Sequence, residues 1–173
     1  MSVKEHAAVV RKVALGGWLL VLLALVALLV APVATAARPA PRTFVAVLSA
    51  GEEVPHCAAA TNASRGVAIF HVIDQATGTV EYKIVANNLP GTPLASHIHV
   101  APPGVPGPIV QPLTLMPGAE NGVIGEGTFT NPALLAALQA NPQAYYVNVH
   151  TDVCRSGVIR GQLGEHGPGG TAE

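Results

Sequence analysis

Short segments in which apolar and polar residues alternate make up most of this chain. Alternation with a period of two is the pattern of a β-strand that is buried on one face. Glycine (18 residues) and proline (15 residues) lie between the segments without a fixed period, which suits turns and excludes a collagen-like repeat. Eight segments are predicted to be strands: residues 43–49, 66–73, 79–87, 95–100, 109–115, 122–129, 145–150 and 157–163.

One segment has the pattern of a helix. Residues 133–141 read ALLAALQAN, and Asn131 and Pro132 suit the N-cap and the first helical position. Short strands with turn signals between them and a single short helix predict an all-β domain, an antiparallel Greek-key β-sandwich or barrel.

The N-terminal 36 residues have the pattern of a targeting segment. A positively charged start is followed by an uncharged stretch over residues 13–31 and by Ala-Thr-Ala at 34–36, which suits signal peptidase. The stretch is also close to the roughly 20 residues that span a bilayer. Residues 1–36 are therefore predicted to be either a signal peptide or an N-terminal membrane anchor, and both place the domain outside the cytoplasm.

The remaining chain divides into three parts. Residues 37–42 are expected to form a proline-rich linker, residues 43–163 the domain, and residues 164–173 a disordered, glycine-rich tail.

The exported part is mildly acidic. From Ala37 onward it has six basic and nine acidic residues, a net charge of −3. Since no basic face is available to neutralise phosphates, nucleic acid is not an expected partner. Membrane contact is expected only through the N-terminal segment, and the sequence does not identify a protein or cell-envelope partner.

Cys57 and Cys154 are the two cysteines of the chain. Outside the cytoplasm two cysteines usually pair, which predicts a Cys57–Cys154 disulfide. The alternative is a thiolate that acts as a metal ligand or nucleophile, although the chain has no C-x-x-C motif.

The sharpest chemical feature is His97-Ile98-His99 in a predicted strand. Residues i and i+2 of a strand project from the same face, so both imidazoles point outward if Ile98 is buried. His150 points outward too if the valines that alternate with it are buried. Three imidazoles on one face suit copper or zinc. His97, His99 and His150 are therefore predicted to form a Cu or Zn site, provided that the two strands lie close together.

A second interpretation of these histidines is structural. They would then hydrogen-bond backbone carbonyls and hold the proline-rich loop that follows, and they would lie too far apart to share an ion. His56 is an optional further metal ligand, whereas His71 is expected to be half-buried in an apolar strand.

Other polar residues carry weaker signals. Ser96 lacks a G-x-S-x-G elbow, so a serine hydrolase is not expected. Glu52 and Glu53 suit a solvated loop better than an acid/base couple. Arg160, between apolar neighbours, is expected to pair with a carboxylate such as Glu53 or Asp152.

Four motifs in a fixed order resemble one family. They are FVAVLSAGEEVP (44–55), the small residues around Gly66, SHIHVAPPGVPGPIV (96–110) and YVNVHTDVCRSGVIRGQL (146–163). Together they are similar to the CHRD domain, which is repeated in the developmental protein chordin and occurs singly in bacterial exported proteins. The resemblance implies a secreted or surface module. It does not extend to growth-factor binding, because chordin's cysteine-rich modules have no counterpart here.

A looser resemblance is to copper/zinc superoxide dismutase. That family has an H-x-H strand in a Greek-key sandwich and a disulfide from an early loop to a late cysteine beside a G-V-I strand, similar to Cys154 and the segment after it. Its bridging histidine and zinc loop have no clear match here. The resemblance implies the fold and a mononuclear copper site, and leaves dismutation in doubt.

These observations favour an exported CHRD-domain binding or structural module, with copper or zinc at the histidine cluster. An enzyme is the less favoured interpretation, and a superoxide dismutase-like redox protein is its alternative form. No catalytic residue is assigned.

Overall fold

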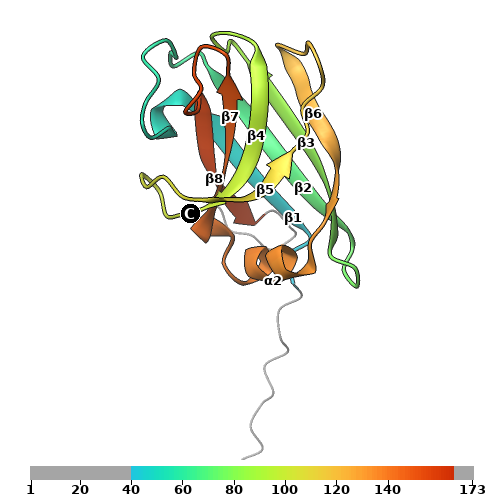
Figure 1. Ribbon diagram of the computed structural model, residues 1–173. Helices are drawn as coiled ribbons and strands as arrows, with labels where there is room; N and C mark the ends of the chain where they lie inside the picture. The colour runs from blue at the N-terminus through green and yellow to red at the C-terminus, as the bar shows by residue number, and fades with distance from the viewer. Residues whose placement is uncertain (1–39, 166–173) are drawn as a thin grey trace, which may run out of the picture. The chain divides into compact units, whose positions relative to one another are not determined.

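The computed structural model describes residues 40–165 of the chain, and these form eight antiparallel strands and one α-helix, as expected (Figure 1). Two short 3₁₀ turns, η1 (Ala50–Glu52) and η2 (Pro142–Ala144), complete the regular structure. The α-helix is α2 (Pro132–Ala140), and the strands are β1 (Thr43–Ser49), β2 (Arg65–Asp74), β3 (Thr79–Asn87), β4 (Pro93–Val100), β5 (Ile109–Leu113), β6 (Gly122–Thr130), β7 (Tyr145–Thr151) and β8 (Ile159–Glu165).

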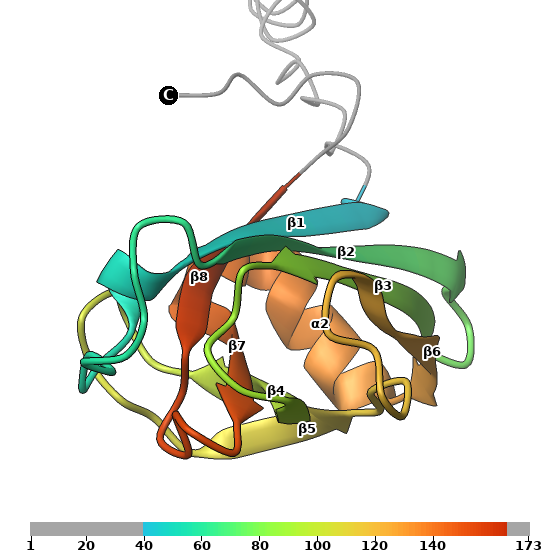
Figure 2. The same ribbon diagram turned by 90° about the horizontal axis from the view of Figure 1, so that it is seen from above.

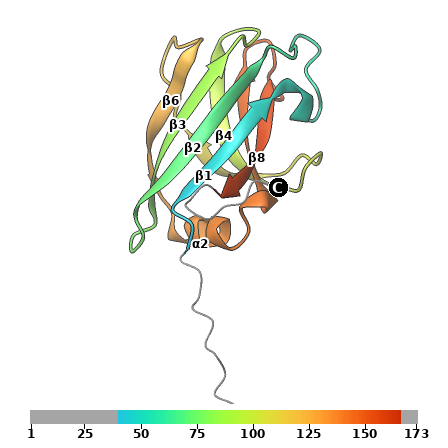
Figure 3. The same cartoon turned by 180° about the vertical axis from the view of Figure 1, so that it is seen from behind.

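The strands form one sheet in the order β5-β4-β7-β8-β1-β2-β3-β6. The sheet curls so that β4, β5, β7 and β8 face β1, β2, β3 and β6 (Figure 2), and the second group lies side by side in Figure 3. The two edge strands of the sheet, β5 and β6, approach each other, since the Met116 N–H after β5 donates to the Ile124 carbonyl of β6. The pairing of β3 with β6 and of β4 with β7 is non-sequential, as in Greek-key connections. The predicted all-β class is confirmed, as a nearly closed barrel.

The core fills the space between the two halves and is mostly aliphatic. Alternate residues of each strand point inward, as in β1, where Phe44, Ala46 and Leu48 are fully buried. Phe70, packed edge-on against Phe129 at 6.5 Å between ring centroids, supplies part of the small aromatic content. Burial on this inner face fixes which side chains project from the outer face, where the candidate site lies.

Helix α2 covers one end of the barrel (Figures 1 and 2). Asn131 accepts a hydrogen bond from the Leu134 N–H and Pro132 occupies the first turn, as the sequence predicts. Leu134, Leu135 and Leu138 insert into the core and so attach the helix to the barrel.

The domain extends beyond its predicted limits. Strand β8 continues to Glu165, and Gly164 pairs with Val45 of β1, so these two residues belong to the sheet rather than to a tail. At the other end, the Arg42 side chain donates to the Val72 carbonyl at 3.0 Å, so the end of the predicted linker is bound to the domain.

The predicted signal peptide or anchor (residues 1–36) and the rest of the predicted tail lie outside the described residues. Within residues 40–165, no helix combines the length and apolar character that crossing a membrane requires.

Candidate metal site

Strand β4 places two of the three predicted histidines on the outer face of the barrel. Ile98 is fully buried in the core, so His97 and His99 project from the opposite side, as predicted. Neighbouring strand β7 pairs with β4 such that His97 lies opposite Asn148 and Ala95 lies opposite His150. The two distant parts of the chain therefore lie side by side.

The three imidazoles meet in one cluster. Nδ1 of His97 lies 3.2 Å from Nε2 of His150, and one ring nitrogen from each of His97, His99 and His150 lies within 4.8 Å of the others. A cluster with this spacing could hold a metal ion, and the predicted convergence is confirmed. The interpretation in which the rings lie too far apart to share an ion is wrong.

Backbone carbonyls fix the tautomers of two of the rings. Nδ1 of His99 donates to the Gly107 carbonyl at 2.8 Å, and Nδ1 of His150 donates to the Arg155 carbonyl at 2.9 Å. In the neutral rings the proton is then on Nδ1 and the lone pair on Nε2. Metal-binding histidines are commonly held in this way. His99 thus anchors the loop over residues 101–108, as the structural interpretation expected, without losing its free nitrogen.

The local environment favours the uncharged form of two of the three histidines. Burial, followed by the nearby His150 and His99, lowers the pKa of His97 to about 4. Burial also lowers the pKa of His150, against an opposing effect of its bond to the Arg155 carbonyl. Neutral imidazoles offer lone pairs to a cation rather than charge to an anion.

Asn148 belongs to the cluster, although the sequence analysis did not single it out. It is 2 % exposed, and its Oδ1 lies 3.1 Å from Nε2 of His99 and 3.1 Å from Nε2 of His150. The signal was present in the strand alternation, because Asn148 stands two residues before His150 and therefore on the same face.

Glu53 is a second residue that the sequence did not place here, because it was expected in a solvated loop. Its side chain is 3 % exposed, and burial raises its pKa to about 7, although the Val54 N–H, Arg160 and Asn148 each favour the charged form. Among residues 40–165, its Oε2 is a buried polar atom that lacks a hydrogen-bond partner. A buried, incompletely satisfied carboxyl group therefore lies beside the histidine cluster.

Arg160 holds the proline-rich loop rather than forming the expected ion pair. It is 1 % exposed, and its guanidinium donates to the carbonyls of Val105 at 2.9 Å and Pro102 at 3.0 Å. Its charge lowers the pKa of Glu53 without being the hydrogen-bond partner of that residue. The loop lies over the outer face and brings Gly107 to His99.

The predicted disulfide is present, and one of its cysteines belongs to the turn that orients His150. Cys57 and Cys154 are bonded, which excludes the free-thiolate alternative for both. Cys154 also accepts from the Gly157 N–H at 3.1 Å and donates to Thr151 at 2.9 Å. The turn that these bonds close carries the Arg155 carbonyl that orients His150.

The other two histidines of the domain lie apart from the cluster. His56 is exposed and its Nδ1 bonds the Ala50 carbonyl at 3.0 Å, so the optional ligand is not brought to the site. His71 is exposed rather than half-buried, because Phe70 and Val72 on either side of it point into the core.

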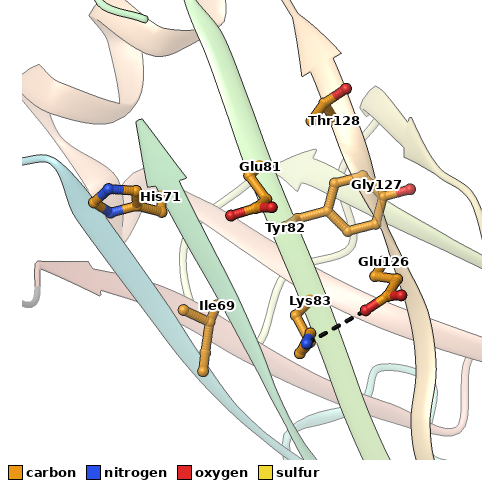
Figure 4. Close-up of a pocket in the computed structure, with 8 residues that line it drawn as sticks. All are labelled: Ile69, His71, Glu81, Tyr82, Lys83, Glu126, Gly127 and Thr128. Atoms are coloured by element: carbon orange, nitrogen blue, oxygen red, sulfur yellow. Dashed lines mark ion pairs between the residues drawn. The ribbon is translucent and has the colours of Figure 1, made fainter. Parts of the chain in front are cut away.

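A shallow pocket lies on the opposite half of the barrel (Figure 4). Lys83 and Glu126, two of its charged residues, pair with each other at 3.3 Å, and both are about half exposed, which leaves a solvated surface pair. The pocket is lined by Ile69, His71, Glu81, Tyr82, Lys83, Glu126, Gly127 and Thr128.

The motifs that meet at the cluster also identify the chain. The family model of the CHRD domain matches residues 44–163. The chain belongs to the CHRD-domain family. This CHRD domain brings Glu53, His97, His99, Asn148 and Arg160, from three separate motifs of the sequence, to one region of the barrel. No curated protein and no solved structure gives a significant match.

Proposed function

We propose that this CHRD domain is an exported binding module that holds one copper or zinc ion at His97, His99 and His150. The observation that carries the proposal is the convergence of three imidazoles, with one nitrogen of each within 4.8 Å of the others. Imidazole nitrogen is a preferred donor for both metals.

The spacing requires only a small adjustment. Bonds of about 2.0–2.1 Å to a tetrahedral ion place donor atoms about 3.3 Å apart, so the widest pair must close by at most about 1.5 Å. His97 is half-buried and can move by side-chain rotation, whereas His99 and His150 are held by the Gly107 and Arg155 carbonyls. The partial exposure of His97 and His150 also leaves a path for the ion from solvent.

Two features support action outside the cytoplasm. Cys57 and Cys154 form a disulfide, which is characteristic of oxidising compartments. The N-terminal 36 residues have the pattern of a signal peptide or membrane anchor. The exported domain is acidic, so its partner at the cell surface is not a nucleic acid.

Isothermal titration of the full chain with Cu²⁺ and Zn²⁺ tests the proposal. The protein is kept in detergent, since it includes the apolar stretch over residues 13–31. One equivalent of metal is expected to bind, and His97→Ala, His99→Ala and His150→Ala are each expected to abolish or greatly weaken it.

His71→Ala and His56→Ala are matched controls, because both remove an exposed histidine outside the cluster. Absence of heat in the wild-type protein would overturn the proposal. Equal loss of binding in the two control variants would show adventitious binding to surface histidines.

The rival function is dismutation of superoxide at a bound copper ion. Two observations favour it: the H-x-H pair on β4, and a disulfide from the early loop to the turn before β8. Superoxide consumption by copper-loaded protein, above that of His97→Ala treated in the same way, would support it. Equal superoxide consumption by the two proteins would exclude dismutation at this site and leave metal binding as the proposed function.

A further inference from the structure

The Asn148 amide lies between two metal-binding nitrogens of the cluster. Its Oδ1 is 3.1 Å from Nε2 of His99 and 3.1 Å from Nε2 of His150, and the residue is 2 % exposed. Strand pairing fixes this position, because Asn148 lies opposite His97 on β4 and opposite Arg160 on β8.

Donor and acceptor counting shows that the amide oxygen faces two acceptors. Nδ1 of His99 and Nδ1 of His150 each use their proton for a backbone carbonyl, so Nε2 of each neutral ring carries a lone pair. An amide oxygen is also only an acceptor. Nδ1 of His97 can donate to Nε2 of His150 at 3.2 Å, which leaves Nε2 of His99 and Oδ1 of Asn148 as two acceptors 3.1 Å apart in a buried position. Such a pair is unfavourable unless a proton or a cation lies between the two atoms.

These three atoms, together with Nδ1 of His97, fit the edges of a coordination tetrahedron. An ion with bonds of about 2.0–2.1 Å separates its tetrahedral donors by about 3.3 Å. The distances from Oδ1 to the two Nε2 atoms are 3.1 Å, and Nε2 of His150 is 3.2 Å from Nδ1 of His97. Three of the six edges are therefore already near the required length.

We infer that Asn148 supplies the fourth donor atom to the metal through Oδ1. This inference rests on the proposed function. It assigns a three-nitrogen, one-oxygen donor set, in which no open position is left to water, to a site otherwise described by three histidines.

Two variants of Asn148 test the assignment in the full chain. Asn148→Leu keeps a similar shape but removes the oxygen. It is expected to weaken Zn²⁺ binding by at least about tenfold, measured by competition with a chromophoric chelator. The visible bands of bound Co²⁺ are expected to change, because water must replace the lost donor.

Asn148→Asp keeps an oxygen at the same position but cannot donate a hydrogen bond. It is expected to retain Zn²⁺ affinity and a Co²⁺ spectrum close to those of the wild type. Gln75→Met is the control: it removes a side-chain amide that lies outside the cluster and bonds the Gln139 side chain. The thermal melting of each metal-free variant checks that it is folded.

Two results would overturn the inference while leaving the metal site intact. One is an Asn148→Leu protein with wild-type affinity and spectrum. The other is an Asn148→Asp protein as weak as Asn148→Leu, which would make Asn148 a hydrogen-bond donor to the imidazoles. A wild-type protein that binds neither Zn²⁺ nor Co²⁺ would instead overturn the proposed function.

Discussion

The central guanidinium carbon of Arg160 lies 3.4 Å from the centroid of the Tyr146 ring. His99 stacks on the same ring, with centroids 4.7 Å apart and planes 5° from parallel. Because β8 and β4 flank β7, Tyr146 lies between the arginine that holds the loop over residues 101–108 and a histidine of the metal site. The Tyr146 hydroxyl also accepts from the Gly107 N–H at 3.1 Å. Loop anchoring and histidine orientation are therefore parts of one packed unit.

Replacing Arg160 tests this unit. Arg160→Lys keeps the charge but loses the planar fork that binds the Pro102 and Val105 carbonyls, so the free energy of unfolding is expected to fall by about 2–4 kcal/mol. Metal affinity is expected to fall as well, since the loop carries the Gly107 carbonyl that orients His99. Urea unfolding of metal-free protein measures the first effect and calorimetry the second.

Arg155→Lys provides the control for this prediction. Its side chain is exposed, and its contribution to the site is a backbone carbonyl, so the change is expected to stay within about 0.5 kcal/mol. Equal effects of the two arginine replacements would contradict the role assigned to Arg160.

Local patterns in the sequence were sufficient for most of the fold and for the histidines. Two predicted strands, residues 43–49 and 79–87, have the predicted bounds, because alternation and turn residues mark both ends. His97 and His99 could be placed on one face because the side-chain period of a strand is two.

Features that depend on distant residues were not predictable in the same way. Residues 157 and 158, predicted to begin the last strand, precede it instead, since β8 begins at Ile159. The φ of Gly157 is 132° and its N–H bonds the Cys154 carbonyl. Glu53 has no local signal for burial, because its surroundings come from Asn148, Arg160 and Gly157, about 100 residues later in the chain.

The buried carboxyl group predicts a specific pH dependence of stability. The pKa of Glu53 is raised from 4.5 to about 7 in the folded protein, mainly by burial and despite attraction by Arg160. Between these values the folded state binds more protons than the unfolded state, so stability is full below about pH 4.5 and is lost as the pH rises through about 7. The loss is at most about 3 kcal/mol.

Glu53→Gln removes this dependence. The neutral amide has nearly the same shape, so the variant is expected to be more stable than the wild type at pH 8 and to lack the decline between pH 5 and about 7. Chemical unfolding across this range, with chelator present, measures the difference. A wild-type protein that gains stability from pH 5 to 8 relative to Glu53→Gln would show that the carboxylate is instead stabilised by Arg160.

The disulfide is expected to support both the domain and the metal site. It closes a loop with a sequence separation of 97 residues, for which chain entropy predicts a stabilisation of about 4.7 kcal/mol. Cys57→Ala combined with Cys154→Ala should lower the unfolding free energy by up to this amount. It should also weaken metal binding, because the turn with the Arg155 carbonyl becomes less restrained. A double variant that keeps full metal affinity would show that the disulfide does not support the metal site.

Two glycines offer a matched test of how closely Glu53 is packed. A Cβ added at Gly157 would collide with the Glu53 carboxyl group, and the φ of 132° also disfavours other residues. Gly157→Ala is therefore expected to lower the unfolding free energy by about 2–4 kcal/mol and to displace Glu53. A Cβ at Gly51, in η1, would meet nothing within 4 Å, so Gly51→Ala is expected to be neutral or slightly stabilising. Thermal and urea unfolding compare the variants, and equal stability of the two proteins would mean that the Glu53 carboxyl group does not lie against Gly157.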